Sequence, residues 1–312
     1  MKTPSTSPKY KIKHKKNRYD INQSPLFKLN SKKRLAEILR CDLSRLKSLR
    51  NDANYSVYPI EECGKTRIIS KPLADLDRVQ TKIATYLCRI NPPNYLHSGI
   101  KGKSNISNAK VHCGQHPVLK TDLVSFFTST SKDMVFSFFY RKMKCQPDIA
   151  ELLSKICTYK EHIPTGSSLS MILAYYANHR MFDELGKVSN EKGITFSVFV
   201  DDLTFSGEKV NTHFKRQVKK IVRKHNHKLH HKKTRIYGAN DAKLITGCII
   251  KGNDLRSRNK DHKKAYDLMA DYEDEENSWE KKHIKNSLLG ILSYISAIEP
   301  KYSNRINKIN RV

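Results

Sequence analysis

The chain of 312 residues is strongly basic, with 59 Lys and Arg against 30 Asp and Glu and a formal charge of +29. A charge excess of this size predicts a polyanionic partner, with nucleic acid as the first candidate and an anionic membrane surface as the competitor. No apolar run approaches the roughly 18 to 20 residues of a membrane-spanning helix, so we expect no membrane partner.

The first predicted elements are a basic N-terminal extension and a hairpin. Residues 1–50 are polar and basic and include a helix expected over Ser31–Leu49. Two β-favouring runs, Tyr55–Ile60 and Thr66–Ser70, flank a glycine-containing turn and predict the hairpin. A helix over Asp75–Ile90 should follow, because apolar residues recur there at helical spacing.

Two basic residues of this hairpin, Lys65 and Arg67, are candidates to clamp a triphosphate. Arg presents a fork of N–H donors that matches phosphate oxygens, and Lys adds a compact positive charge. Solvated surface charge is the ordinary alternative for either residue taken alone.

Three carboxylates fall at the ends of predicted strands. Val118–Asp122 is typical of a strand that ends in an acidic residue, and Asp201 and Asp202 interrupt an apolar, β-favouring run. Side chains alternate along a strand, so only a tight hairpin presents both members of the pair at one place. A polar turn is the ordinary interpretation of the pair alone. Together with Asp122 it predicts a site for two Mg²⁺ ions about 3.5 to 4 Å apart, with Mn²⁺ as an alternative, and this arrangement suits nucleotidyl transfer.

Between these carboxylates, Ile163–Ser170 forms a Pro/Gly turn, and the apolar residues that follow predict one long helix through Met181. The N-terminus of this helix could receive a phosphate or abut the template, because helix N-termini present free N–H groups. A capped core helix is the alternative.

The segment His213–Arg235 contains ten Lys or Arg and no acid, while its apolar residues recur at helical spacing. We expect a helix with an apolar face on a sheet and a cationic outer face, on which Lys219, Lys220 and Arg223 contact nucleic acid. A solvated face is the ordinary alternative, although uncompensated positive charge lowers stability. A last helix over Trp279–Ala297 would complete a C-terminal helical region.

Signals of location are few. The N-terminus lacks the apolar core of a signal peptide, and the 7 cysteines are scattered without a C-x-x-C pair. This pattern favours a cytoplasmic location, where thiols stay reduced.

Taken in chain order, five short motifs resemble the palm of a reverse transcriptase over roughly residues 55 to 250. They are Asp122-x-x-x-Phe126-Phe127, Pro164-x-Gly166 before a helix, Val200-Asp201-Asp202, Lys233-Thr234 and Leu244-Ile245-Thr246-Gly247. Two further matches resemble the bacterial retron branch. Asn108-Ala109-Lys110-Val111-His112 fits its N-A-x-x-H motif, and Ile245-Thr246-Gly247 fits its V-T-G motif with Ile in place of Val.

The resemblance implies an α+β, right-hand polymerase fold. Fingers and palm would occupy residues 51–250, with an antiparallel palm sheet that carries the carboxylates, and a small helical thumb would occupy residues 251–312. The chain departs from the family where Phe199-Val200 replaces Tyr-Ala, Thr165 replaces Gln and Met171 replaces Pro.

The resemblance also implies roles for individual residues. Asp122, Asp201 and Asp202 would bind the metal ions, and the implied nucleotide-binding residues are Lys65, Arg67, Leu123 through its backbone, Phe126, Phe127, Gly166 and Lys233. Phe127, with Phe126 as the neighbouring candidate, would exclude a ribose 2′-hydroxyl, and Lys233 would donate a proton near the pyrophosphate. The implied RNA-binding residues are Asn108, Ala109, His112, Ile245, Thr246, Gly247, Lys219, Lys220 and Arg223.

The function expected from the resemblance is that of a retron-type reverse transcriptase in a bacterial cytoplasm. It would bind its cognate structured non-coding RNA (msr-msd), prime from an RNA 2′-hydroxyl and use deoxynucleoside triphosphates to make a branched, RNA-linked single-stranded DNA (msDNA). Such proteins act in antiphage defence with a separate effector protein. Two alternatives remain open: another class of bacterial reverse transcriptase, and a non-catalytic RNA-binding protein with a degenerate palm.

Overall fold

The computed structural model describes residues 10–12, 17–62 and 64–311. Part of the predicted basic extension (1–9 and 13–16) and Cys63 in the predicted hairpin turn lie outside the described residues. The chain forms two compact units. Unit 1 comprises Met1–Gly102, Leu123–Lys187 and Gln217–His230, and unit 2 comprises Lys103–Asp122, Val188–Arg216 and His231–Val312. Each unit is therefore assembled from three separate stretches of sequence.

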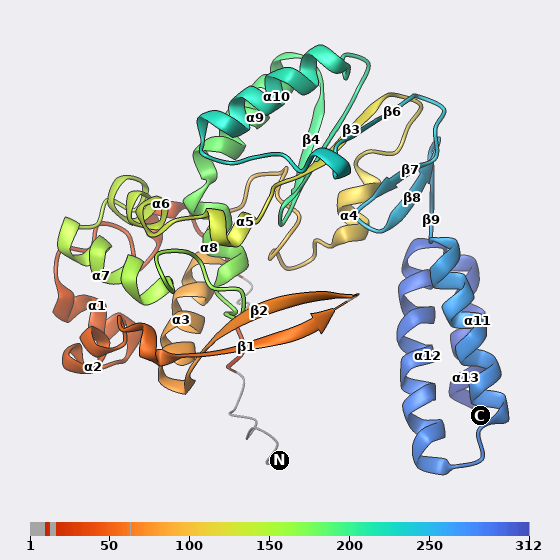
Figure 1. Ribbon diagram of the computed structural model, residues 1–312, viewed down its shortest axis with the longest axis horizontal. Helices are drawn as coiled ribbons and strands as arrows, with labels where there is room; N and C mark the ends of the chain where they lie inside the picture. Colours follow the sequence, from red (N-terminus) through yellow and green to blue (C-terminus); the bar gives the residue numbers. More distant parts are fainter. Residues whose placement is uncertain (1–9, 13–16, 63, 312) are drawn as a thin grey trace. The chain divides into compact units, whose positions relative to one another are not determined.

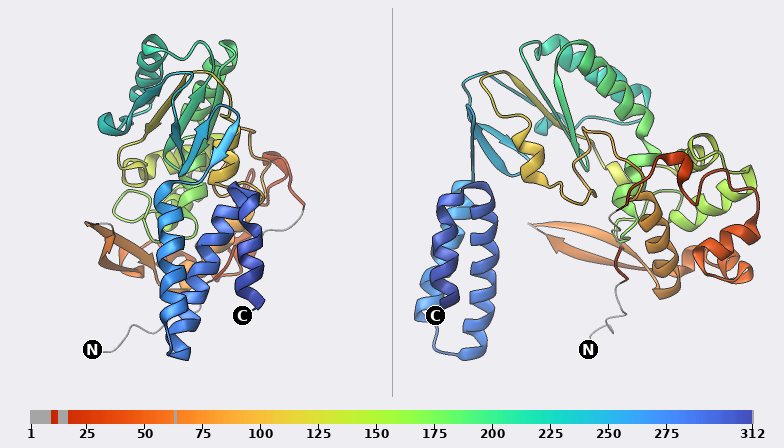
Figure 2. Two further views of the ribbon diagram at one scale, coloured as in Figure 1. Left: turned by 90° about the vertical axis from the view of Figure 1, so that its right-hand side faces the viewer. Right: turned by 180° about the vertical axis from the view of Figure 1, so that it is seen from behind.

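Unit 1 is mainly helical and carries one long hairpin (Figure 2). The hairpin pairs β1 (Tyr55–Glu62) with β2 (Lys65–Pro72) in antiparallel register. The helices of unit 1 are α1 (Lys32–Leu39), α2 (Leu43–Ser48), α3 (Ala74–Leu87), α5 (Phe126–Ser129), α6 (Lys132–Ser137), α7 (Pro147–Cys157) and α8 (Ser170–Ala177). Two more helices, α9 (His179–Glu191) and α10 (Thr212–Lys224), begin in one unit and end in the other.

Unit 2 contains two antiparallel sheets and the C-terminal helices. The first sheet has the order β4-β5-β3-β6, from β3 (Val118–Asp122), β4 (Thr195–Phe199), β5 (Asp202–Ser206) and β6 (Arg235–Tyr237). The second has the order β7-β8-β9, from β7 (Lys243–Ile245), β8 (Cys248–Lys251) and β9 (Asp254–Arg256). A short helix, α4 (Asn105–Lys110), and a 3₁₀ turn, η4 (His231–Lys233), complete this part of unit 2.

The C-terminal helices α11 (Asn259–Asp274), α12 (Ser278–Ile298) and α13 (Ser303–Arg311) run side by side in the ribbon views (Figures 1 and 2). They enclose a small apolar core in which Leu288, Leu292 and Ile295 of α12 are buried. The predicted last helix is thus confirmed, because its apolar residues do recur on one side. Among residues 10–12, 17–62 and 64–311, no helix combines the length and the apolar character needed to cross a membrane.

The antiparallel sheets and surrounding helices confirm the α+β class. The predicted strand over Val118–Asp122, the β1–β2 hairpin and the helix near Asp75–Ile90 are also present, the last as α3. These elements were predictable because strand alternation and helical spacing are local properties of a sequence.

Three predicted helices are shorter than expected. The single helix over Ser31–Leu49 is wrong, because the chain divides it into α1 and α2 at Arg40. Arg40 adopts a left-handed φ of 52° and its N–H donates to the carbonyls of Ala36 and Glu37, which closes α1. This is the usual way in which a helix C-terminus satisfies its last carbonyl groups.

The long helix predicted to run through Met181 is also wrong, because α8 ends at Ala177 and α9 starts at His179. Asn178 stands between them, and its buried amide donates to Thr130 Oγ1 and accepts from His227 Nε2. The basic helix predicted over His213–Arg235 ends at Lys224 for a related reason. The following residues turn through Asn226 at φ 62° and bury His227 against Asn178.

Candidate active site

The three predicted metal-binding carboxylates all lie in unit 2, at one end of the β4-β5-β3-β6 sheet. The register pairs Asp122 of β3 directly with Asp202 of β5, and directly paired residues of an antiparallel sheet project from the same face. Asp201 lies in the two-residue turn between Phe199 and Asp202. The register therefore places Asp122 and Asp202 side by side, and Asp201 lies near enough to both for their charges to affect it. That the three carboxylates bind metal stays a prediction.

The turn that carries Asp201 is strained. Val200 has a φ of 60°, a left-handed conformation that a β-branched residue rarely adopts. A two-residue hairpin turn with positive φ at its first position normally has Gly there. Backbone strain of about 1 to 3 kcal/mol is typical of residues that hold functional groups in place.

Negative charge accumulates at this end of the sheet. Burial, and then the neighbouring Asp122 and Asp202 carboxylates, raises the pKa of Asp201 to about 6. Burial also raises the pKa of Asp202, against the opposing effect of Lys120. Like charges in a partly buried site disfavour one another's ionised form, so a bound cation would relieve a real electrostatic cost.

One cation of the protein already contacts this site. Lys233 in η4 donates to Asp122 Oδ2 at 2.9 Å, and this hydrogen bond raises the pKa of Lys233. The adjacent Thr234 and Thr121 hydroxyls lie 2.6 Å apart and hold η4 against β3. The resemblance implies that Lys233 lies near the pyrophosphate; in the structure its ammonium contacts the Asp122 carboxylate.

The donor set fits a hard divalent cation, because it offers carboxylate oxygens in a region of raised carboxyl pKa. In the part of the chain that the structure describes, no three His, Cys, Asp or Glu side chains are grouped as a metal centre. Asp122 is engaged with Lys233, so metal binding would require this ion pair to open or to be shared.

The predicted nucleotide-binding aromatic residues lie in unit 1. Phe126 is 3% exposed and packs against Phe182 and His227, whereas Phe127 is only partly buried. Leu123 is buried and its backbone forms an isolated antiparallel bridge with Leu229. Of the two rings, Phe127 is the one left with exposed surface, and its role as a sugar filter stays a prediction.

Gly166 lies against the β1–β2 hairpin within unit 1. A Cβ there would lie 2.8 Å from the carbonyl oxygen of Ser70 and 3.0 Å from Cα of Lys71, so only glycine fits without a shift. Thr165, in the place of the family's Gln, donates to the carbonyl of Ile68 at 2.8 Å. Arg67 is exposed on the same hairpin, and the side chain of Lys65 lies outside the described part of the structure.

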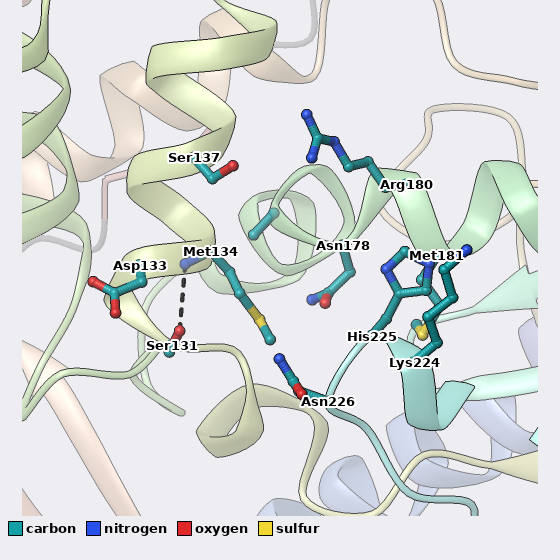
Figure 3. Close-up of a pocket in the computed structure, with 11 residues that line it drawn as sticks. Ser131, Asp133, Met134, Ser137, Asn178, Arg180, Met181, Lys224, His225 and Asn226 are labelled. Atoms are coloured by element: carbon teal, nitrogen blue, oxygen red, sulfur yellow. Dashed lines mark hydrogen bonds between the residues drawn. The ribbon is translucent and has the colours of Figure 1, made fainter. Parts of the chain in front are cut away.

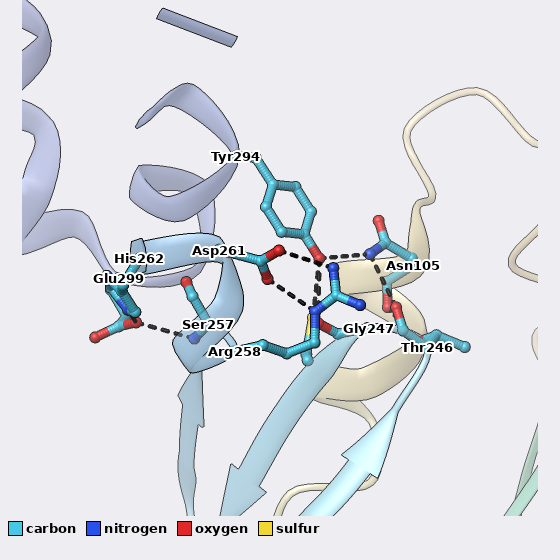
Figure 4. Close-up of polar contacts among 10 residues, drawn as sticks. Asn105, Thr246, Gly247, Ser257, Arg258, Asp261, His262, Tyr294 and Glu299 are labelled. Atoms are coloured by element: carbon cyan, nitrogen blue, oxygen red, sulfur yellow. Dashed lines mark hydrogen bonds and ion pairs between the residues drawn. The ribbon is translucent and has the colours of Figure 1, made fainter. Parts of the chain in front are cut away.

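Most residues of the two retron-like motifs that were predicted to bind RNA are buried in unit 2, whereas Lys110 and Val111 are exposed and Gly247 is half-buried. Asn108, Ala109, His112 and Ile245 are each 0% exposed, and Thr246 is 8% exposed. The two motifs contact each other through a long hydrogen bond of 3.5 Å from Asn108 Nδ2 to Thr246 Oγ1. Thr246 Oγ1 also donates at 2.8 Å to the carbonyl of Asn105, which lies just before the first motif on α4 (Figure 4). Direct RNA contact by these residues stays a prediction, and it would require the surrounding structure to open.

The predicted cationic face of α10 is present. Phe214, Val218 and Val222 are buried, whereas Lys219, Lys220 and Arg223 are exposed. At the end of the helix, Lys224 and His225 both contact Glu184 of α9, so the charge of Lys224 is partly compensated.

The sequence alone did not indicate several residues of the site. Lys120 lies two residues before Asp122, so the alternation of the strand could have placed it on the same face. No local sequence pattern indicates Ser197, Ser206 or Tyr294, because each forms its hydrogen bond with a residue more than 40 positions away.

Unit 1 also contains an open cavity of about 360 Å³ between α6, the junction of α8 and α9, and the end of α10 (Figure 3). Met134, Arg180 and Asn226 are among the residues that line it. None of the residues predicted to bind metal, nucleotide or RNA lines this cavity.

Comparison with known proteins finds matches to reverse transcriptases. Residues 51–266 match the family described as reverse transcriptase (RNA-dependent DNA polymerase). The chain is 30% identical over 215 residues to the retron Se72 reverse transcriptase of Salmonella heidelberg, covering 66% of this chain and 55% of that protein. It is 26% identical over 279 residues to the retron Ec86 reverse transcriptase of Escherichia coli, covering 82% and 85%. The chain thus spans about half the length of the first relative and most of the second.

Among solved structures, telomerase from Candida albicans in complex with a fragment of telomeric RNA aligns with a TM-score of 0.49 and 11% identity. The alignment covers 81% of this chain and 54% of that one. A foamy viral protease-reverse transcriptase in complex with double-stranded DNA aligns with a TM-score of 0.45 and 16% identity, covering 83% and 38%. The curated relatives named here are bacterial retron reverse transcriptases. Since the family match extends over more than two thirds of the sequence, the chain belongs to the reverse transcriptase family.

Proposed function

We propose that this protein is an RNA-directed DNA polymerase that makes a branched, RNA-linked single-stranded DNA (msDNA) on its cognate non-coding RNA. The observation that carries the proposal is the convergence of Asp122, Asp201 and Asp202 at one end of a palm-type sheet, in a chain whose relatives are retron reverse transcriptases. We assign fingers and palm to residues 51–250 and the thumb to residues 251–312.

The carboxylates hold the catalytic cations in this proposal. Enzymes of this family depend on divalent metal ions, and two Mg²⁺ ions, when bound, would activate the attacking hydroxyl and neutralise the leaving pyrophosphate. Asp122, Asp201 and Asp202 supply the oxygen ligands. Lys233, which pairs with Asp122, would be released by the incoming cations and would donate a proton to the leaving pyrophosphate.

The remaining predicted residues bind and select substrates. Lys65 and Arg67 of the β1–β2 hairpin contact the triphosphate, and Phe127 excludes a ribose 2′-hydroxyl by steric clash. Lys219, Lys220 and Arg223 contribute exposed positive charge for RNA. Priming would use a 2′-hydroxyl of the RNA, which produces the branch.

The named relatives are bacterial retron reverse transcriptases. The proposal extends to a bacterial cytoplasmic enzyme that acts in antiphage defence with a separate effector protein. Another class of bacterial reverse transcriptase is disfavoured by the two retron-like motifs, and a non-catalytic RNA-binding protein by the three assembled carboxylates.

The test is to express the full chain with the RNA encoded beside its gene and to isolate nucleic acid from the complex. We expect a DNA joined to RNA through a 2′,5′ linkage that debranching enzyme cleaves. Asp201→Ala should abolish the product, whereas Glu208→Ala, an exposed carboxylate just beyond β5, should not. DNA that persists in Asp201→Ala would refute the catalytic assignment, and DNA without a 2′,5′ linkage would refute the retron assignment.

A further inference from the structure

His112 lies immediately beyond α4, is 0% exposed, and bridges two strands of the catalytic sheet. Its Nε2 atom lies 2.6 Å from the hydroxyl of Ser197 on β4, and its Nδ1 atom lies 2.7 Å from the hydroxyl of Ser206 on β5. These strands form the hairpin whose turn contains Asp201. Both ring nitrogens are therefore used to join the two arms of the hairpin that presents the catalytic pair.

The His112 bridge lies on the same face of the sheet as the paired carboxylates. Ser206 pairs with Val118, and four residues earlier on the same strand Asp202 pairs with Asp122. Because side chains alternate along a strand, residues four apart project from the same face. The imidazole thus fixes the far end of the two strands that carry Asp201 and Asp202 at their near end.

The hydrogen bonds to His112 explain why the fold tolerates two buried serine hydroxyls at these positions. Ser197 is 0% exposed and Ser206 is 2% exposed, and buried hydroxyls are destabilising unless they are hydrogen-bonded. Solvent does not reach the bridge, so water cannot replace the imidazole if it is removed. A neutral imidazole offers one donor and one acceptor, and each hydroxyl can rotate to match it.

The N-terminal end of α4, at Asn105, contacts the second motif, Ile245-Thr246-Gly247. Asn105 Nδ2 donates to the carbonyl of Thr246 at 3.0 Å and to the hydroxyl of Tyr294 at 3.1 Å (Figure 4). Tyr294 belongs to α12, and its hydroxyl in turn donates to the carbonyl of Gly247 at 3.4 Å. Figure 4 shows these side chains pointing toward one another from α4, the β7–β8 turn and α12. Both retron-like motifs are therefore joined through α4, by a buried contact at His112 and half-buried contacts at Asn105.

We propose that His112 is a positioning residue for nucleotidyl transfer, which sets the β4–β5 hairpin through Ser197 and Ser206 and so holds Asp201 and Asp202 against Asp122. The inference rests on the proposed polymerase function. It gives the N-A-x-x-H segment a role inside the catalytic sheet instead of a direct contact with RNA. The Asn105–Thr246–Tyr294 contacts anchor the helix from which His112 acts.

The test compares the purified full chain with His112→Phe, which keeps the volume of the ring and removes both hydrogen bonds. On cognate RNA and on an unrelated RNA template with a DNA primer, we expect kcat to fall about 10- to 100-fold, as small misplacements of reacting groups do. The KM for deoxynucleotides and the Kd for RNA should stay within about twofold. Ser197→Ala combined with Ser206→Ala should act in the same direction, and His112→Gln, which keeps a donor and an acceptor, should recover part of the lost kcat.

A matched control is Val111→Ser, which changes the exposed neighbour of His112 within the same motif. It should leave kcat and RNA affinity unchanged. If His112→Phe instead weakens only the binding of cognate RNA and leaves kcat on the unrelated template intact, the segment contacts RNA and the proposal is overturned. Unchanged kcat in the His112 and serine variants would overturn it as well.

Amide hydrogen exchange supplies a second measurement that does not depend on activity. His112→Phe should accelerate exchange in β4 and β5 while protection in α11 to α13 is retained, and protection unchanged in β4 and β5 would contradict the proposal. If the single variant does not fold, Ser197→Ala and Ser206→Ala each remove one hydrogen bond and should give the same local effect. A wild-type protein that makes no DNA would refute the proposed function, and the exchange data would still decide whether His112 holds the hairpin.

Discussion

At the scale of single residues, Asp201 is expected to lower the stability of the metal-free fold while serving as a metal ligand. Its carboxylate is partly buried beside two others, and its pKa of about 6 records how strongly the fold disfavours its charge. The same crowding of carboxylates would favour a bound divalent cation. A residue of this kind is expected to destabilise the metal-free protein and to be indispensable for catalysis.

We predict that Asp201→Asn stabilises the metal-free protein and abolishes DNA synthesis. Raising the pKa of Asp201 from 3.8 to about 6 corresponds to roughly 3 kcal/mol, so we expect a gain of about 1 to 3 kcal/mol in the free energy of unfolding at pH 8. Urea denaturation in EDTA measures this gain. The native state binds the extra proton below pH 6, so the wild type should approach the variant in stability as the pH falls from 8 toward 5. A variant that is less stable at pH 8 would contradict the electrostatic argument.

The same raised pKa predicts the pH dependence of catalysis. Protonation of Asp201 below about pH 6 removes a metal ligand, so incorporation at low Mg²⁺ should fall by on the order of tenfold per pH unit there. Protons and cations compete for the site, so a higher Mg²⁺ concentration should move the inflection to lower pH. Single-nucleotide incorporation measured from pH 5 to 8 at two Mg²⁺ concentrations tests both points. A profile that is flat down to pH 5 at low Mg²⁺ would exclude this role for Asp201.

At the scale of elements, the β1–β2 hairpin and the segment around Gly166 form one substructure of unit 1. Thr165 donates to the carbonyl of Ile68 and receives a long hydrogen bond from the backbone N–H of Ser70 at 3.4 Å. Threonine in place of the family's Gln thus fastens this segment to β2. The neighbouring Gly166 allows the two backbones to approach.

We predict that Gly166→Ala displaces β2, lowers stability by about 1 to 3 kcal/mol and raises the KM for deoxynucleotides. The added Cβ would lie 2.8 Å from both Ile69 Cγ2 and the Ser70 carbonyl oxygen, closer than such atoms pack. Thermal unfolding and steady-state kinetics provide the measurements. Gly290→Ala is the matched control, because nothing lies within 4 Å of a Cβ at that position and alanine favours its helix. Equal effects of the two substitutions would show that the close approach is unimportant.

Helix α10 is the second element with a testable role. We predict that replacing Lys219, Lys220 and Arg223 by Gln weakens RNA binding about tenfold or more and reduces its salt dependence by up to three charge equivalents, with kcat at saturating RNA unchanged. Binding titrations at several salt concentrations measure both effects. Lys47→Gln with Arg50→Gln removes exposed charge from another surface and should have a smaller effect per charge. A larger effect from that control would move the RNA-binding surface away from α10.

At the scale of the whole molecule, the formal charge of +29 is far larger than the exposed positive charge of α10 alone can supply. Positive charge is distributed over both units, so RNA binding should involve many phosphate contacts. A protein with roughly six or more such contacts loses on the order of a thousandfold in affinity between 50 and 200 mM salt. We predict a loss of this size for the wild-type protein, measured by fluorescence titration with cognate RNA. A loss below about tenfold would mean that shape and base contacts dominate.

The local elements of the fold were predictable from particular residues. The β-favouring run before Asp122 and the apolar run around Asp201 predicted β3, β4 and β5, and the register then placed Asp122 and Asp202 on one face. The three shortened helices were not predictable, because Arg40, Asn178 and Asn226 end them through backbone conformation and long-range hydrogen bonds. Helical spacing of apolar residues continues across such breaks, so periodicity alone does not reveal them.

The sequence by itself determined the family, the three candidate carboxylates and the cationic helix. Motif order, strand propensity and charge can each be read from residues that are close together in the chain. Only the tertiary structure decided that Lys233 pairs with Asp122, 111 residues away, and that His112 is buried between Ser197 and Ser206. These contacts depend on how distant segments pack and on which polar groups lose their water. His112, from a motif that predicted an RNA-binding surface, therefore lies against the β4–β5 hairpin, where burial requires each hydroxyl to find a partner.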